Sequence, residues 1–117
     1  MNLFARFFGR HAKDEAIRRE LIKKLDGRPI KYVTERVPKP GAYDETEEIV
    51  IGRSGAIIVK DGFLLVFADG NVLFRAETEK LKASELYSME GVILTAPDIE
   101  NGGKVRTVIA YYTYFMK

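Results

Sequence analysis

Residues 56–74 have the sequence AIIVKDGFLLVFADGNVLF, in which two Asp-Gly pairs separate three apolar segments of strand length. Tight hairpin turns need positive φ, which Asp, Asn and Gly adopt most easily. The stretch therefore predicts strands over residues 56–60, 63–68 and 72–77, joined at Asp61-Gly62 and Asp69-Gly70. A third turn of this kind, Asn101-Gly102-Gly103, separates strands predicted over residues 91–96 and 104–115.

An amphipathic helix is predicted before these strands, over residues 12–26. Its apolar stripe consists of Ile17, Leu21, Ile22 and Leu25. Gly27 and Pro29 end the helix, because Gly caps helices in a left-handed conformation and Pro cannot continue them. We therefore expect a leader and helix over residues 1–28 and a β region over residues 29–117, within one domain.

The first half of the β region alternates less regularly. Alternation from residue 30 to 35 predicts a first strand, which Pro38-Lys39-Pro40-Gly41 ends. A further strand is predicted from Glu48 to Ile51, and Gly52-Arg53-Ser54-Gly55 is interpreted as a turn or bulge with positive φ at Gly.

Residues 80–90 fit a short edge strand over 80–84 followed by a helical turn over 84–90 that Ser84 would cap. The predicted class is mainly β (α+β by content). We expect an antiparallel small barrel or sandwich of six to seven strands, with one N-terminal amphipathic helix.

Four segments resemble the strand rhythm of bacterial PH-like and GRAM-like domains: GAIIVKDGFLLVF (55–67), VLFR (72–75), LKASEL (81–86) and GVIL (91–94). The resemblance covers residues 47–115 and implies a small barrel plugged by a C-terminal helix. No helix is predicted after the last strand here, so the helix over residues 12–26 would have to take that place.

Composition excludes several kinds of chemistry. The 117-residue chain has no Cys, so disulfides and thiolate sites are excluded and a reducing, cytoplasmic setting fits. His11 is the only histidine, and we interpret it as an exposed residue before the helix. No apolar run approaches the roughly 18 residues of a membrane span, and the N-terminus lacks the features of a secretory signal. We predict no cofactor and no metal.

Two loops are candidate ligand sites. The acidic run Asp44, Glu45, Glu47 and Glu48 lacks the central Gly of a calcium loop and is interpreted as a solvated approach to a strand. The GxxG spacing of residues 52–55 lies between strands, whereas the nucleic-acid clamp of KH domains joins helices. We expect no nucleic acid, and retain Arg53 and Ser54 as a candidate anion contact at a loop tip.

Charge is unevenly distributed. Residues 1–31 hold nine Lys and Arg against four Asp and Glu, whereas the remainder is slightly acidic. Within the leader, Leu3, Phe4, Phe7 and Phe8 share one helical face beside Arg6 and Arg10, a pattern suited to a membrane interface. We favour the alternative, in which Phe4, Phe7 and Phe8 pack into the domain or across a dimer.

The last strand is aromatic on both sides. One side carries Val105, Thr107, Ile109, Tyr111, Thr113 and Phe115; the other carries Arg106, Val108, Ala110, Tyr112, Tyr114 and Met116. With the first side toward the core, Tyr112 and Tyr114 would need covering by the N-terminal helix or a second subunit.

These patterns favour a non-enzymatic interaction module of the bacterial cytoplasm that self-associates through its N-terminal segment or last strand. One alternative is a peripheral membrane or phospholipid-binding module that uses Phe4, Arg6, Phe7, Phe8 and Arg10. A further alternative is a small enzyme with carboxylate chemistry, which requires a deep pocket with two convergent Asp or Glu of raised pKa.

Overall fold

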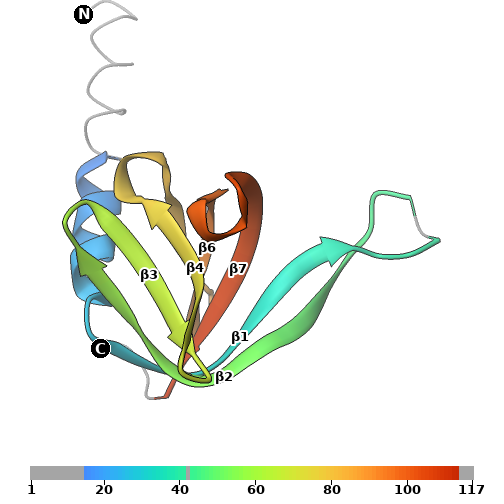
Figure 1. The fold of residues 1–117 in the computed structure, drawn as a ribbon, viewed down its shortest axis with the longest axis horizontal. Coiled ribbons are helices and arrows are strands. Elements are labelled where there is room, and N and C mark those ends of the chain that lie inside the picture. Colours follow the sequence, from blue (N-terminus) through green and yellow to red (C-terminus); the bar gives the residue numbers. More distant parts are fainter. Residues whose placement is uncertain (1–14, 42, 114–117) are drawn as a thin grey trace, which may run out of the picture.

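The computed structural model describes residues 15–41 and 43–113. Within these residues seven antiparallel strands form one sheet in the order β4-β3-β2-β1-β7-β6-β5. The strands are β1 (Arg28–Pro38), β2 (Thr46–Lys60), β3 (Phe63–Ala68), β4 (Asn71–Glu77), β5 (Lys82–Glu85), β6 (Gly91–Asp98) and β7 (Lys104–Tyr112). The sheet curls into a half-barrel (Figure 1). The predicted mainly β, antiparallel class is confirmed, and because all seven strands share one sheet, the fold is barrel-like rather than a sandwich.

The Asp-Gly turns lie where the sequence predicts them. Asp61 and Gly62 have φ of 54° and 82°, and the residues on either side pair directly across the β2–β3 hairpin. Asp69-Gly70 repeats this geometry between β3 and β4, with φ of 54° and 76°. Positive φ at both loop residues matches the right-handed twist of the strands, so these turns determine the hairpin register.

Residues 52–55 do not form the turn that was one of the two predicted alternatives, because β2 runs through them as one strand of 15 residues, whereas the other alternative, a bulge, is present directly beside them. The pairing with β1 shifts between Val33 and Thr34, which leaves an extra residue in β2 as a bulge. Positive φ falls on Ser54 (52°) and not on the glycines. Gly55 instead allows β2 to approach β3 closely, because a Cβ there would lie 1.7 Å from the carbonyl oxygen of Phe67.

The predicted edge strand near residues 80–84 is present as β5, after a 3-10 turn, η1 (Thr78–Lys80). The helical turn predicted over residues 84–90 is wrong. Ser84 pairs with Ile93 of β6, so sheet pairing uses the residue that would have capped the turn.

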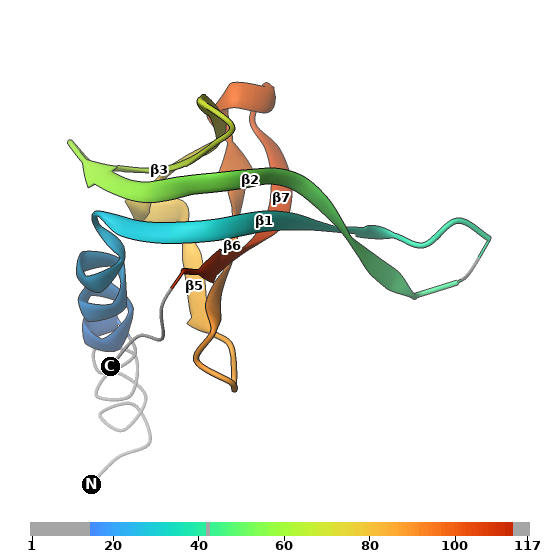
Figure 2. The same ribbon diagram turned by 90° about the horizontal axis from the view of Figure 1, so that it is seen from below.

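Residues 15–25 are helical, and the helix lies at one end of the half-barrel beneath β1 and β2 (Figure 2). Ile22 and Leu25 are buried, whereas Ile17 is 59% exposed, so the predicted apolar stripe reaches the core only at its C-terminal end. Gly27 has φ of 78° and its amide donates to the carbonyl of Ile57 at 2.7 Å, which confirms the predicted cap.

Polar contacts tie the helix to the sheet. The guanidinium of Arg18 donates to the carbonyl oxygens of Thr78 (2.6 Å) and Leu81 (3.2 Å). Asp26 accepts from the amide of Val59 at 2.8 Å. These bonds position the helix against β2 and η1.

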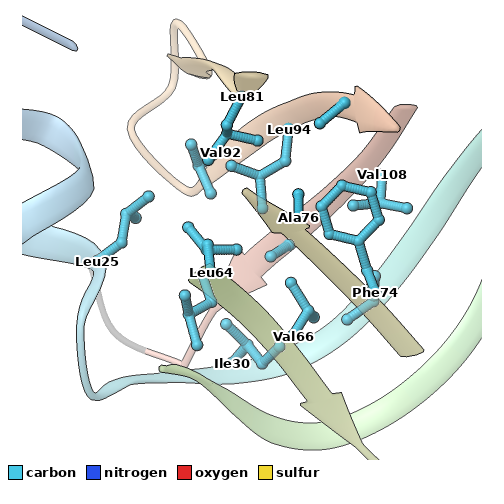
Figure 3. Packing of buried hydrophobic residues seen from close by; sticks show 14 of the residues in the cluster. Leu25, Ile30, Leu64, Val66, Phe74, Ala76, Leu81, Val92, Leu94 and Val108 are labelled. Carbon is cyan, nitrogen blue, oxygen red and sulfur yellow. The ribbon is translucent and has the colours of Figure 1, made fainter. Parts of the chain in front are cut away.

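The hydrophobic core lies inside the curled sheet. Leu25 points from the helix toward side chains of the strands, among them Leu64 and Phe74 (Figure 3). Leu25, Leu64 and Phe74 are fully buried, and burial of such side chains contributes about 1.5–3 kcal/mol each. One core therefore joins the helix and the half-barrel.

Replacement of Gly55 by Ala should lower the free energy of unfolding by about 3 kcal/mol or more, since the new methyl group would force β2 away from β3. The control is Gly41→Ala, where the φ is 76° and no atom lies within 4 Å, so only left-handed strain of about 1–2 kcal/mol applies. Urea denaturation measures both, and equal losses would contradict the close-approach explanation.

Candidate interaction surface

The β1–β2 hairpin extends beyond the rest of the sheet. β7 pairs with β1 only as far as Arg36, and β3 pairs with β2 only from Gly55 onward. We define residues 36–41 and 43–50 as the hairpin arm. Beyond Arg36 the outer edges of the arm have no neighbouring strand among the described residues, and the arm projects from the end of the sheet opposite the helix (Figures 1 and 2).

The arm exposes apolar side chains. Tyr43 near its tip is 92% exposed, Val50 is 50% exposed and Ile49 is 44% exposed. The acidic run of residues 44–48 is also exposed, which confirms its interpretation as a solvated approach to a strand. Exposed apolar side chains on a two-stranded ribbon with free edges form a template for contact with another chain.

A tyrosine cluster fixes the base of the arm. The carboxylate of Glu48 accepts from the hydroxyls of Thr34 and Tyr111, both at 2.9 Å. The Tyr111 ring stacks on Tyr32 with centroids 4.6 Å apart. Burial, followed by the hydrogen bond to Glu48, raises the pKa of Tyr111 to about 12. β7 thereby holds the arm at a defined angle.

A buried ionic network lies on the other face of the same strands. The guanidinium of Arg106 forms a bidentate pair with Glu35, at 2.7 and 2.9 Å, and a hydrogen bond to Asp98 at 2.6 Å. It also donates to the carbonyl of Leu73 in β4 at 3.0 Å. Asp98 is fully buried, and the backbone amides of Arg75 and Glu100 donate to it at 3.0 Å.

These contacts shift the ionisation of the network. The hydrogen bond from Arg106 lowers the pKa of Glu35. Burial works to raise the pKa of Asp98, but donors from the backbone and from Arg106 and Asn101 outweigh burial, so the net shift is downward. The pKa of Arg106 is raised, chiefly by its hydrogen bond with Glu35. Both carboxyl groups therefore stay ionised, the opposite of what the enzyme alternative requires of a general acid.

Two hollows flank the helix. One, of about 580 Å³, lies between the helix and β5, and Ile17, Leu21 and Glu85 contribute to its lining. The other, of about 530 Å³, lies between the helix, the β2–β3 turn and η1; we call it the basic groove. Its lining residues are Ala16, Arg18, Arg19, Glu20, Ile22, Lys23, Val59, Gly62, Thr78 and Glu79.

Of the tyrosines predicted as contacts, Tyr112 is in the core. It is 3% exposed, with the guanidinium of Arg28 at 4.7 Å from its ring centroid. The side of β7 that carries Val108 and Tyr112 faces inward, so the predicted orientation of the last strand is wrong. Tyr111, the next residue along the strand, faces outward and stacks on Tyr32. Tyr114 and the leader residues Phe4, Arg6, Phe7, Phe8 and Arg10 lie outside the described residues, as does His11.

The candidate anion contact of Arg53 and Ser54 does not lie at a loop tip, because both residues belong to β2. They are exposed, and the amide of Arg53 donates to the carboxylate of Asp69 at 3.1 Å. The structure therefore places a negative group beside Arg53, which does not favour an anion there.

Sequence reasoning missed the hairpin arm and the Arg106 network. A signal for the network was present: Arg106 shares its side of β7 with Val108, Ala110 and Tyr112, an otherwise apolar set. A charged residue on a core-facing side needs buried partners. Nothing in the sequence nominated Glu35 and Asp98, which lie 71 and 8 residues away along the chain.

Over residues 15–41 and 43–113, no three His, Cys, Asp or Glu side chains gather as a metal site, and no helix is long and apolar enough to cross a bilayer. No family model matches the chain, and neither a curated protein nor a solved structure shows significant similarity to it. The fold thus defines a small mainly β half-barrel domain, and the PH-like and GRAM-like resemblance stays a prediction.

Replacement of Arg106 by Met should lower the free energy of unfolding by about 3–5 kcal/mol at pH 7, because Asp98 loses its buried partner. Since the folded-state pKa values of Glu35 and Asp98 are lowered, their ionisation stabilises the fold fully above about pH 5 and progressively less below about pH 4. The difference in the free energy of unfolding between wild type and the Arg106→Met variant should therefore be smaller at pH 3 than at pH 7.

Urea denaturation at both pH values measures this difference. Arg53→Met is the control, since Arg53 is exposed, and it should change stability by less than about 0.5 kcal/mol at either pH. A difference for Arg106→Met that is as large at pH 3 as at pH 7 would contradict the assignment.

Proposed function

We propose that this protein is a non-enzymatic interaction module that self-associates through the hairpin arm. The observation that carries the proposal is the exposure of Ile49 and Val50 on a projecting ribbon whose base Glu48 and Tyr111 hold in place. Apolar residues on a rigid projection lose unfavourable contact with water on association, at little cost in conformational entropy. The proposed surface differs from the last strand predicted from sequence, because Tyr112 is buried. The other predicted surface, the N-terminal segment of residues 1–11, lies outside the described residues.

Wild-type protein should form a concentration-dependent dimer in sedimentation equilibrium. The double variant Ile49→Thr/Val50→Thr keeps β-branched side chains but adds hydroxyls, and should raise the dimer Kd at least about tenfold, equivalent to 1.4 kcal/mol. Tyr87→Thr is the control: Tyr87 is fully exposed but lies between β5 and β6, which β7 separates from the strands of the arm, and should leave the Kd unchanged. Wild type that stays monomeric at high concentration would refute the proposal.

A second candidate is a peripheral membrane or phospholipid-binding module. The observation that favours it is the exposure of Arg19, Lys23 and Lys24 on the helix that follows the basic leader. Clustered cations near a membrane surface contribute about 1 kcal/mol each toward binding of anionic lipid.

For this candidate, vesicles that contain phosphatidylserine should sediment the full chain but not a chain that lacks residues 1–11. Vesicles of neutral lipid are the control and should retain neither protein, because the attraction is electrostatic. Equal sedimentation of both chains with anionic vesicles, or of neither, would eliminate the leader as a membrane anchor.

A further inference from the structure

The lining of the basic groove contains three basic residues, Arg18, Arg19 and Lys23, against two carboxylates, Glu20 and Glu79, so its charge is positive by one. Arg18 is occupied by Glu15 and by two backbone carbonyls, and Arg19 reaches Glu15 only at 3.8 Å. Lys23 is exposed and makes no ion pair with any described residue. The groove therefore presents Arg19 and Lys23 to solvent beside the partly buried side chain of Val59.

The hairpin arm has the opposite charge. Its acidic residues are Asp44, Glu45, Glu47 and Glu48, against the basic residues Arg36 and Lys39. Lys39 pairs with Glu45 at 3.6 Å, and Glu48 is held by Tyr111 and Thr34. Asp44 and Glu47 remain. Because side chains alternate along a strand, Glu47 shares a face with Ile49, away from Glu48.

Two arms are poorly suited to pair with each other. Antiparallel pairing of two β2 edges would bring the Glu47 and Glu48 side chains of both copies together, and opposed like charges destabilise a sheet. The β1 edge of the arm contains Pro38, and the following loop contains Pro40; neither has an amide hydrogen to donate. The complementary surface on this chain is the basic groove.

An arm cannot reach the groove of its own chain, because the arm and the helix lie at opposite ends of the sheet (Figures 1 and 2). Two copies placed side by side in opposite directions, however, bring each arm next to the partner's helix. Such an arrangement has two-fold symmetry, so the same contact forms twice and closes the assembly at a dimer.

We propose that the arm of one copy docks in the basic groove of a second copy, reciprocally, with Glu47 beside Arg19 and Lys23. This proposal rests on the proposed function and adds the surface that receives the arm. Ile49 then packs against Val59 and the aliphatic stems of Arg19 and Lys23. Two equivalent contacts help to reach the roughly 1,200–2,000 Å² that stable interfaces bury.

The test exchanges charges across the contact. Glu47→Lys and Lys23→Glu should each raise the dimer Kd at least about tenfold, because each places like charges together in both halves of the dimer. Lys82→Glu, an exposed charge change outside both hollows, should have no effect.

An equimolar mixture of the two charge variants should dimerise within about threefold of wild type. In the mixed dimer, the arm that carries Glu47→Lys meets the groove that carries Lys23→Glu, so the introduced charges are opposite in sign. The second contact of that dimer joins a native arm to a native groove and keeps its native charges.

Sedimentation equilibrium reports each outcome. Loss of the dimer in Ile49→Thr/Val50→Thr together with wild-type behaviour of both charge variants would overturn the docking site and leave self-association through the arm intact. Failure of the mixture to dimerise would also overturn the docking site. Assembly that continues past the dimer would overturn the reciprocal arrangement, and a monomeric wild type would overturn both proposals.

Discussion

The guanidinium of Arg106 joins parts of the sheet that no strand ladder connects. β4 is an edge strand in the sheet order, yet it must meet the end of β6 for the sheet to curl. Arg106 bridges them, through the carbonyl of Leu73 in β4 and the carboxylate of Asp98 in β6, and also binds Glu35 in β1. Apolar side chains of equal volume could fill this space, but they could not select these acceptors. The network therefore specifies how the half-barrel closes.

The arm is a consequence of unequal strand lengths around that closure. β2 has 15 residues, whereas β3 on one side has six, and β7 stops pairing with β1 at Arg36. Beyond these limits the two longest strands continue as a ribbon. Glu35 and Glu48 anchor its base on opposite faces, one through Arg106 and the other through Tyr111. The same strands thus serve the core at one end and present an exposed surface at the other.

Features encoded by neighbouring residues were predictable, and features that depend on distant contacts were not. The Asp61-Gly62 turn and the Gly27 cap follow from local backbone preferences, and both are confirmed. Gly55 is required for a different reason: a side chain there would collide with the carbonyl oxygen of Phe67. That proximity is visible only in the fold. Alternation separated Tyr111 from Tyr112 but could not tell which side faced inward, because both sides of β7 are apolar.

Folding also separates in space the positive and negative charges that nearly cancel in the net charge of +2. The cations of the helix lie at one end of the sheet and the carboxylates of the arm lie at the other, so the two sets cannot pair with each other within one chain. Glu47 and Glu48 make the free edge of β2 unfavourable for pairing with an identical edge, which protects an exposed ribbon from indiscriminate strand addition. Repulsion of that kind leaves cationic surfaces as the favoured partners, and a groove lined by Arg19 and Lys23 is present on every copy. In the proposed dimer, the charges that disfavour pairing of identical edges also direct the arm to the groove of a second copy.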